Sequence, residues 1–300
     1  MRHSRWGLGA GAIVAGAALA ACGPGGMASP AGQTSTPSPA KVLDAAYTTT
    51  TSAGTAKVDL AGQIGTTVDG KPENVPINAN GVVDFTHKAA DLNESVAGSA
   101  KDLTETRYLN GMLYQRIPSQ AAGLTGGKQW IAMDLNQAAS NQGNTGLSGL
   151  LASAPSDPSD LLMYLTAVEG QVKTVGPDTV DGAQTTHYDA TIDLDKVATL
   201  DPGAASTTKQ LEQQLGSNSL PIQLWVDQQN RVRKISLDEN IAHPVPGSTT
   251  SGGTATTGQN GQQLTIGSVH VAVTVTMSDY GTPVHIVAPP ADQTDNLTNK

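Results

Sequence analysis

A repeated alternation of apolar and polar residues constrains the fold of this 300-residue chain more than any other feature. Every second residue from Val269 to Met277 is valine or methionine, and three of the four residues between them are histidine or threonine. Because successive side chains of a strand point to opposite faces, this pattern predicts a strand with one buried face. The same character recurs in residues 56–61, 83–86, 103–117, 129–135, 187–193, 222–227 and 235–241. So many strands of this kind predict a large antiparallel sheet with one apolar side.

Three segments have helical spacing instead. Residues 41–48 carry apolar side chains three or four positions apart, residues 157–165 begin with Asp-Pro and carry three leucines, and residues 206–215 end before Gly216. Proline in the first turn and glycine after the last turn are typical of helix ends. We therefore expect an α+β fold in which a curved antiparallel β-sheet, a half-barrel, carries helices on its concave face. A β-sandwich is the competing architecture, and the central helices argue against it.

The first 22 residues have the pattern of an export signal. Arg2 and Arg5 form a basic start, an uncharged apolar run follows, and the run ends with Leu-Ala-Ala before Cys22. A basic start, an apolar run and small residues are typical of such signals. The run is shorter than the roughly 20 apolar residues of a membrane-spanning helix. Leu-Ala-Ala-Cys is similar to a bacterial lipobox, whose cysteine receives a diacylglyceryl group; the alternative is an ordinary secretory signal with a cysteine nearby by chance.

A lipid on Cys22 predicts anchorage to a cell membrane at its extracytoplasmic face, because two acyl chains hold a protein firmly. Residues 1–21 are then the signal peptide, and residues 22–40, mostly Gly, Pro, Ala, Ser and Thr, are a flexible tether. The expected folded domain covers 41–290, with a disordered loop at 247–263 and a tail at 291–300. Since Cys22 is the only cysteine, the chain has no intramolecular disulfide.

The charge balance excludes one class of partner. The net charge of the whole chain is −9, and cleavage before Cys22 removes two arginines and no acidic residue. An acidic surface repels the phosphate backbone of nucleic acids and anionic lipid headgroups. We therefore expect no nucleic acid among the partners of this chain.

The catalytic signals in the sequence are weak. Ser206 and Lys209 have the S-x-x-K spacing of penicillin-binding enzymes, but Ser38 and Lys41 repeat that spacing at the end of the tether. Neither match is accompanied by Lys-Thr-Gly or Ser-Asp-Asn. A serine acyl enzyme thus remains an alternative, and the prediction is a protein without catalytic residues, enzymatic activity or cofactor.

The histidines and one basic cluster offer two further possibilities. His187 and Asp189 lie two apart on the polar side of a predicted strand, and a metal site would need a third ligand to converge on them. No metal-binding residues are therefore predicted. Arg231, Arg233 and Lys234 are either a contact for a lipid headgroup or a solvated strand end.

Several segments of the chain resemble a known family. They are Trp130–Leu135 (WIAMDL), Leu161–Gly170 (LLMYLTAVEG), Val175–Leu194 (VGPDTVDGAQTTHYDATIDL), Leu220–Ile235 (LPIQLWVDQQNRVRKI) and Met277–Pro290 (MSDYGTPVHIVAPP). In their order and in their residues, these segments resemble the LppX/LprA/LprF/LprG lipoproteins of mycobacteria and related actinobacteria. The resemblance extends from about residue 41 to residue 290.

The resemblance implies a fold similar to the carriers LolA and LolB, with an apolar cavity that takes the acyl chains of envelope lipids or glycolipids, and no enzymatic activity. The expected function is binding or shuttling of such lipids. The alternative is a surface module that recognises an envelope protein and carries no lipid. The candidate cavity residues are Val83, Phe85, Met112, Leu161, Leu162, Leu165, Val271 and Val273, and ordinary core packing is the competing role for each.

Overall fold

The computed structural model describes residues 38–68, 71–96, 104–118, 123, 125–134, 162–241, 254–257 and 263–297. The chain divides into two units, Met1–Thr36 and Pro37–Lys300, and every described residue belongs to the second. The predicted signal peptide, Cys22, most of the tether and Leu161 therefore lie outside the described residues.

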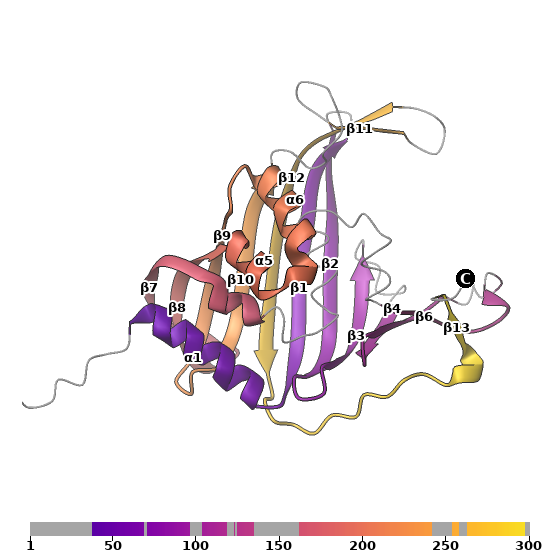
Figure 1. Cartoon of the computed structure of the whole chain (residues 1–300), viewed down its shortest axis with the longest axis horizontal. Coiled ribbons are helices and arrows are strands. Elements are labelled where there is room, and N and C mark those ends of the chain that lie inside the picture. Colours follow the sequence, from indigo (N-terminus) through magenta and orange to yellow (C-terminus); the bar gives the residue numbers. More distant parts are fainter. Residues whose placement is uncertain are drawn as a thin grey trace, which may run out of the picture. The chain divides into compact units, whose positions relative to one another are not determined.

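The described strands form one open, 13-stranded sheet. They are β1 (Thr55–Val68), β2 (Lys71–Asp84), β3 (Ala89–Val96), β4 (Thr104–Leu109), β5 (Met112–Arg116), β6 (Trp130–Asp134), β7 (Val168–Val180), β8 (Ala183–Asp193), β9 (Ser219–Asp227), β10 (Val232–Ile241), β11 (Thr254–Thr257), β12 (Gln263–Ser278) and β13 (Thr294–Asn296). Their order is β13-β6-β5-β4-β3-β2-β1-β12-β10-β9-β8-β7, with β11 paired to β12 alone (Figure 1). Neighbours are antiparallel except for β13 and β6, which are parallel.

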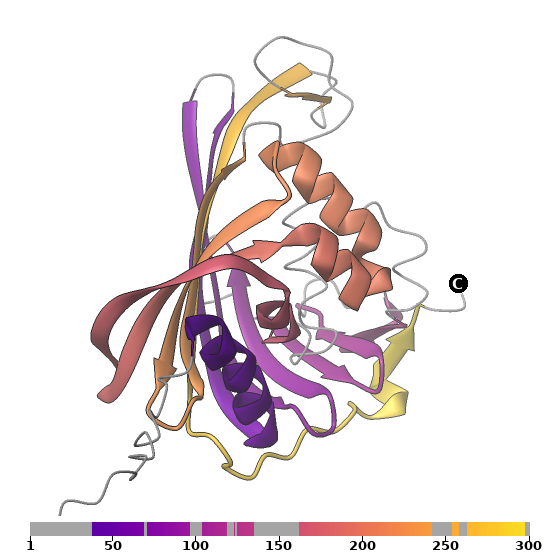
Figure 2. The same cartoon turned by 60° about the vertical axis from the view of Figure 1, so that its left-hand side comes forward.

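Helices lie on one side of this sheet. The α-helices are α1 (Pro39–Ser52), α5 (Leu194–Leu200) and α6 (Ala205–Leu215), and the 3₁₀ helices are η3 (Tyr164–Ala167), η4 (Pro202–Ala204) and η5 (Ala291–Gln293). Figure 2 shows the sheet bending around α1, η3, α5 and α6, which occupy its concave side. The principal contacts between helices and strands run from α1 to β7 and β10, from η3 and α5 to β8, and from α6 to β10. The predicted fold class is confirmed.

Local sequence explains where the helices begin and end. Pro39 opens α1, where its missing N–H costs nothing. The carboxylate of Asp193 caps α5 by accepting hydrogen bonds from the backbone N–H groups of Asp195 and Lys196. Gly216 ends α6 in the left-handed conformation, with a φ of 69°. The sequence predicted the end of α6 correctly. It did not predict α5, because a helix of only seven residues is too short to show a helical period.

The turn at Asn110-Gly111 sets the register of β4 against β5. Both residues have positive φ, 55° and 74°, as a tight two-residue hairpin turn requires. Leu109 consequently pairs with Met112, and Tyr108 with Leu113. This hairpin confirms the turn predicted from the sequence.

Most of the buried apolar side chains form one core cluster between the helices and the concave side of the sheet. Leu43 of α1, Leu211 of α6 and Leu224 of β9 are fully buried members. On β12, Val271, Val273 and Met277 are buried, which fits the alternation in the sequence.

Two parts of the described chain differ from the expected outline. Residues 254–257, within the segment expected as a disordered loop, form β11 against the start of β12. Residues 294–296, expected in a tail, form β13 beside β6. Backbone hydrogen bonds from Gln129 N to Gln293 O and from Leu297 N to Ala132 O hold this edge strand. The pairing joins residues more than 160 positions apart, so local pattern gave no sign of it.

No helix among the described residues has the length and apolarity needed to cross a bilayer.

Candidate functional site

The candidate site is the concave face of the sheet, where the family resemblance implied a cavity. Val83, Phe85, Leu162, Leu165, Val271 and Val273 are each between 0% and 7% exposed and all belong to the core cluster. The structure therefore brings six of the eight candidate residues together. Such burial is typical of packed core side chains. That any of them contacts a ligand stays a prediction.

Met112 lies on the opposite face from the other candidates. It precedes Leu113 on β5, and Leu113 is opposite Tyr108, a buried member of the core cluster. Since side chains alternate along a strand, Leu113 points to the concave side and Met112 to the convex side. The prediction for Met112 is therefore corrected, and Leu113 takes its place. The hairpin turn decides which residues of β5 face the concave side. The five residues of β5 are too few for their sequence pattern to show it.

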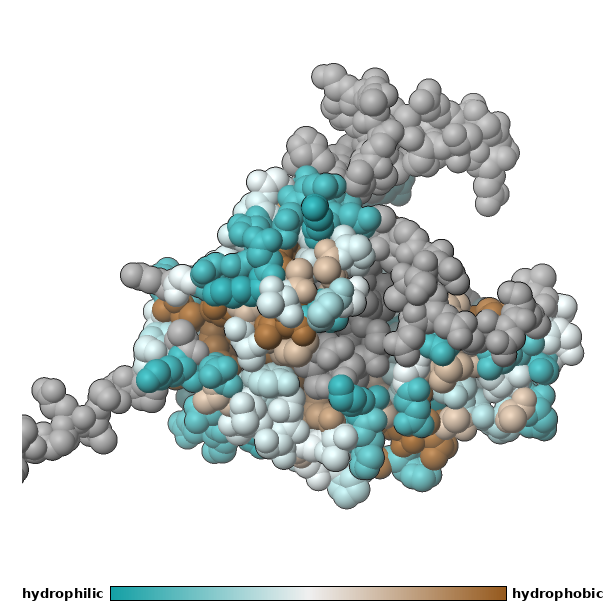
Figure 3. Space-filling model, in the orientation of Figure 1, coloured by the Kyte–Doolittle hydropathy of each residue, from teal (hydrophilic) through white to brown (hydrophobic). Residues whose placement is uncertain are grey.

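Part of the concave face keeps its aliphatic side chains partly exposed. On β1, Val58, Leu60 and Ile64 pack against the core cluster without being fully buried. Comparable residues on neighbouring strands are Leu92 of β3, Leu113 of β5, Val269 and Val275 of β12, and Ile235 of β10. Figure 3 shows hydrophobic residues at the surface of the helix-bearing side, below hydrophilic ones. A concave apolar surface of this kind is the usual setting of a ligand site.

Two partly buried carboxyl groups interrupt this apolar face. Glu94 of β3 is opposite Ala79, which is opposite Leu60, so all three side chains share the concave side. Glu239 of β10 is opposite Val271, again on the concave side. Burial raises the pKa of both carboxyls, and the negative charge of Asp238 raises that of Glu239 further.

A hydroxyl pair accompanies Glu94. Thr106 Oγ1 donates a hydrogen bond of 3.3 Å to Glu94 Oε2, which moderates the upward shift of the carboxyl pKa. Tyr108, two residues along β4, is buried, and both burial and the charge of Glu94 raise the pKa of its phenol. Carboxylate and hydroxyl groups at one place in an apolar face give that place a polar anchor.

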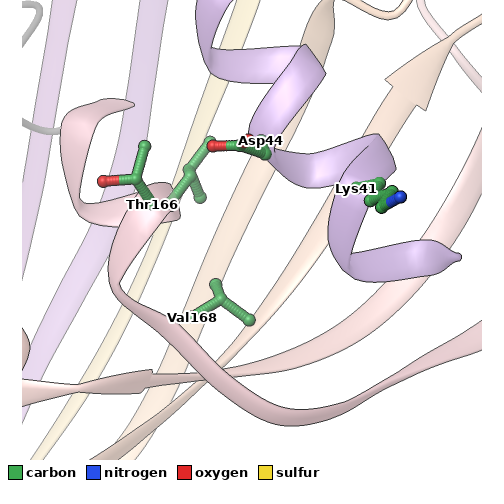
Figure 4. A pocket seen from close by; sticks show the side chains of 5 residues that line it. Lys41, Asp44, Thr166 and Val168 are labelled. Carbon is green, nitrogen blue, oxygen red and sulfur yellow. The ribbon is translucent and has the colours of Figure 1, made fainter.

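A pocket of about 340 Å³ opens between α1 and η3. Figure 4 shows its lining, with Lys41 and Asp44 on α1, Thr166 on η3 and Val168 at the start of β7; Leu165 completes it. Leu165 is the candidate residue that reaches this pocket. The lining thus combines two aliphatic side chains with two opposite charges and a hydroxyl.

A second pocket, of about 510 Å³, lies on the convex side. Lys57 and Asp59 of β1 and their register partners Ser278 and Thr276 of β12 line it, together with Asp181, Arg233 and Asp279. All seven side chains are polar or charged, so this pocket does not have the apolar lining that hydrocarbon requires.

The predicted histidine positions lie on the convex face as well. The His187 ring stacks on Trp225 with centroids 4.1 Å apart, and its Nε2 is 3.7 Å from Asp189 Oδ1. His270 Nε2 is 2.7 Å from Asp238 Oδ1 on another part of the sheet. Within the described ranges, no three His, Cys, Asp or Glu side chains are grouped to hold a metal ion.

Each cation of the basic cluster contacts other residues of the fold, and Arg231 and Arg233 both lie over the Tyr280 ring. Arg231 forms an ion pair of 2.9 Å with Asp227, and Arg233 lies over the Tyr280 ring. Lys234 Nζ lies 3.7 Å from the centroid of the Trp225 ring. These contacts orient the three cations within the fold. Ser206 and Lys209, the residues of the S-x-x-K match, are both exposed on α6.

Comparisons with known proteins give relatives of low sequence identity. No protein-family model matches the chain. An uncharacterized 31.2 kDa protein of Streptomyces griseus is 25% identical over 205 residues, which are 66% of this chain and 67% of that protein.

Three solved structures show the range of structural similarity. The Mycobacterium tuberculosis lipoprotein LppX is 16% identical, covers 83% of this chain and 100% of its own, and gives a TM-score of 0.43. LprF from Mycobacterium bovis is 16% identical with coverages of 83% and 96% and a TM-score of 0.42. A LolA-superfamily protein from Nitrosomonas europaea is 12% identical with coverages of 81% and 93% and a TM-score of 0.29. The solved structures similar to this chain thus include the lipoproteins LppX and LprF and a LolA-superfamily protein.

Proposed function

We propose that this chain is a lipid-anchored extracytoplasmic protein that binds the acyl chains of an envelope lipid or glycolipid on the concave face of its sheet. The observation that supports this function is the set of partly exposed aliphatic side chains there, represented by Leu60, Leu92 and Val275. An ordinary core would bury them against other side chains, whereas a hydrocarbon ligand would complete their burial.

The free energy of burying an acyl chain indicates the role of such a protein. Burial of roughly 500 Å² of acyl chain at about 25 cal/mol per Å² gives on the order of 12 kcal/mol relative to water. A lipid in a bilayer already has this stabilisation, so its transfer into the protein is close to neutral. The role of the concave face is then to shield hydrocarbon tails while the lipid moves between sites.

A pair of variants on β1 tests acyl binding. Leu60→Glu introduces a charge on the concave side, and Ala61→Glu introduces the same charge at the next, exposed residue on the convex side. We expect the wild type and Ala61→Glu to bind a fluorescent monoacylglycerol probe equally, and Leu60→Glu to bind it at least about tenfold more weakly, since burial of an unpaired charge is costly. Circular dichroism checks that both variants fold.

Extraction of the purified full chain with organic solvent gives an independent test. We expect mass spectrometry to find co-purified acyl lipid in the wild type and less of it in Leu60→Glu. A folded wild-type protein that carries no lipid and binds no monoacylglycerol probe would contradict acyl binding. Recognition of an envelope protein, the alternative from the sequence, would then be the function to pursue.

The membrane anchor is tested separately. In a bacterial host that processes lipoproteins, we expect the wild type to incorporate an alkyne-labelled fatty acid and to sediment with membranes. Cys22→Ser should lose both properties, because Cys22 is the only cysteine. The matched control adds Ser35→Cys to Cys22→Ser, which restores a thiol outside the lipobox. Labelling of that control to the wild-type level would contradict lipidation specific to Cys22.

A further inference from the structure

Glu94 stands at one end of an apolar row that crosses the sheet. The register places Glu94 of β3 beside Ala79 of β2, Leu60 of β1, Val275 of β12 and Ile235 of β10. All four neighbours in this row are apolar, and all four are only partly buried. Adjacent strands lie about 4.8 Å apart, so the row extends roughly 19 Å from the carboxyl, a length suited to an acyl chain.

The Glu94 carboxyl has no cationic partner among the residues that the structure describes. It accepts the hydrogen bond from Thr106, and no described lysine, arginine or histidine forms an ion pair with it. The arginines nearest in sequence on β4 and β5, Arg107 and Arg116, pair with Glu105. A carboxylate in an apolar face without a cation costs free energy, so a binding role would explain its presence better than packing.

We propose that Glu94 determines the headgroup specificity of the concave face, which favours acyl lipids with an uncharged, hydroxyl-bearing polar end and disfavours free fatty acids. This inference rests on the proposed function. The ionised carboxyl accepts a hydrogen bond from a ligand hydroxyl, while Thr106 occupies one of its oxygen atoms. The carboxylate of a fatty acid at the same place meets a like charge in a medium of low dielectric constant, which opposes its binding.

The experiment compares two ligands of equal chain length. A monoacylglycerol and the corresponding free fatty acid compete with a fluorescent probe for the full chain at neutral pH. We expect the wild type to bind the monoacylglycerol at least about tenfold more tightly, the scale of one like-charge contact near a protein surface. In Glu94→Gln, which keeps the shape of the side chain and removes its charge, the two affinities should differ by less than about threefold.

Two further variants separate specificity from a structural effect. Glu94→Asp keeps the charge and should retain the preference. Asp59→Asn removes the same charge from an exposed residue on the convex side of β1 and should leave the preference unchanged. A preference that persists in Glu94→Gln, or equal affinities in the wild type, would overturn this inference and leave acyl binding intact. Absence of binding for both lipids would overturn the proposed function and the inference together.

Discussion

Strands β9 and β1 both contribute to the concave face, but their side chains there are buried to different extents. On β9, Leu220, Ile222, Leu224 and Val226 are all buried. On the concave side of β1, Ala56 at the start is buried, and the aliphatic residues that follow on that side stay partly exposed. The principal helix contacts reach β7, β8 and β10, and the last two are the neighbours of β9. Alternation alone thus makes a face apolar, and the helices decide which part of it becomes core.

The largest expected effect is on the free energy of unfolding, when a leucine of β9 or of β1 is truncated to alanine. Leu224→Ala removes a fully buried side chain of β9 and should lower the free energy of unfolding by about 2–5 kcal/mol. Leu60→Ala removes a partly buried side chain of β1 and should cost roughly 1 kcal/mol. Urea unfolding of both variants measures the difference. Equal losses would mean that β1 is packed as tightly as β9 and would remove the distinction between the regions.

The next effect concerns the connection of α1 to the covered region. Thr50 is fully buried, and its Oγ1 accepts a hydrogen bond of 2.8 Å from the backbone N–H of Val232 at the start of β10. Thr50→Val keeps the shape but leaves that N–H without its partner, so we expect a loss of about 1–3 kcal/mol. The exposed Thr48→Val is the control and should change the unfolding free energy by less than about 0.5 kcal/mol. A neutral Thr50→Val would show that this bond does not hold α1 on the sheet.

A smaller effect is expected at the cap of α5. Asp193→Ala removes the carboxylate that accepts from the N–H groups of Asp195 and Lys196, and should cost about 1 kcal/mol. Asp195→Ala, at an exposed position of the same helix, keeps the cap and serves as the comparison. Thermal unfolding of the two variants tests whether Asp193 supports the helix over β8. An Asp195→Ala variant as destabilised as Asp193→Ala would argue against a specific capping role.

The smallest expected effect is a pH dependence in the less covered region. Burial raises the pKa of the Glu94 carboxyl, so the folded chain binds this proton more readily than the unfolded chain does. Its contribution to stability is therefore fully present below the ordinary glutamate pKa and is lost as pH rises through the folded value. Glu94→Gln should then gain stability relative to the wild type between acidic and neutral pH, as measured by urea unfolding. A difference that is the same at both pH values would contradict this effect.

Local sequence predicted several elements correctly for identifiable reasons. The strand that ends at Ser278 follows from its valine alternation, the hairpin at Asn110-Gly111 from residues that accept positive φ, and the end of α6 from Gly216. The concave candidates Val83 and Val271 were predicted as apolar positions of strands, and both are in the core cluster.

Other features had no adequate local signal. Met112 was assigned to the wrong face, because a five-residue strand gives too little alternation to fix its parity. The α5 helix depends on the cap at Asp193 and on burial of Leu194 and Val197 against its neighbours. Glu94 resembles any polar strand residue until the register places it in an apolar row.

The sequence by itself determined the alternation of the strands, the tight hairpin and the end of α6, because each depends on residues close together in the chain. The number of such strands and helices in turn predicted the sheet-with-helices architecture. Only the tertiary structure decided the strand order, the edge strand after residue 293, and the extent to which helices cover each part of the concave face. Those outcomes depend on contacts between residues far apart in sequence, whose free energies no local pattern specifies.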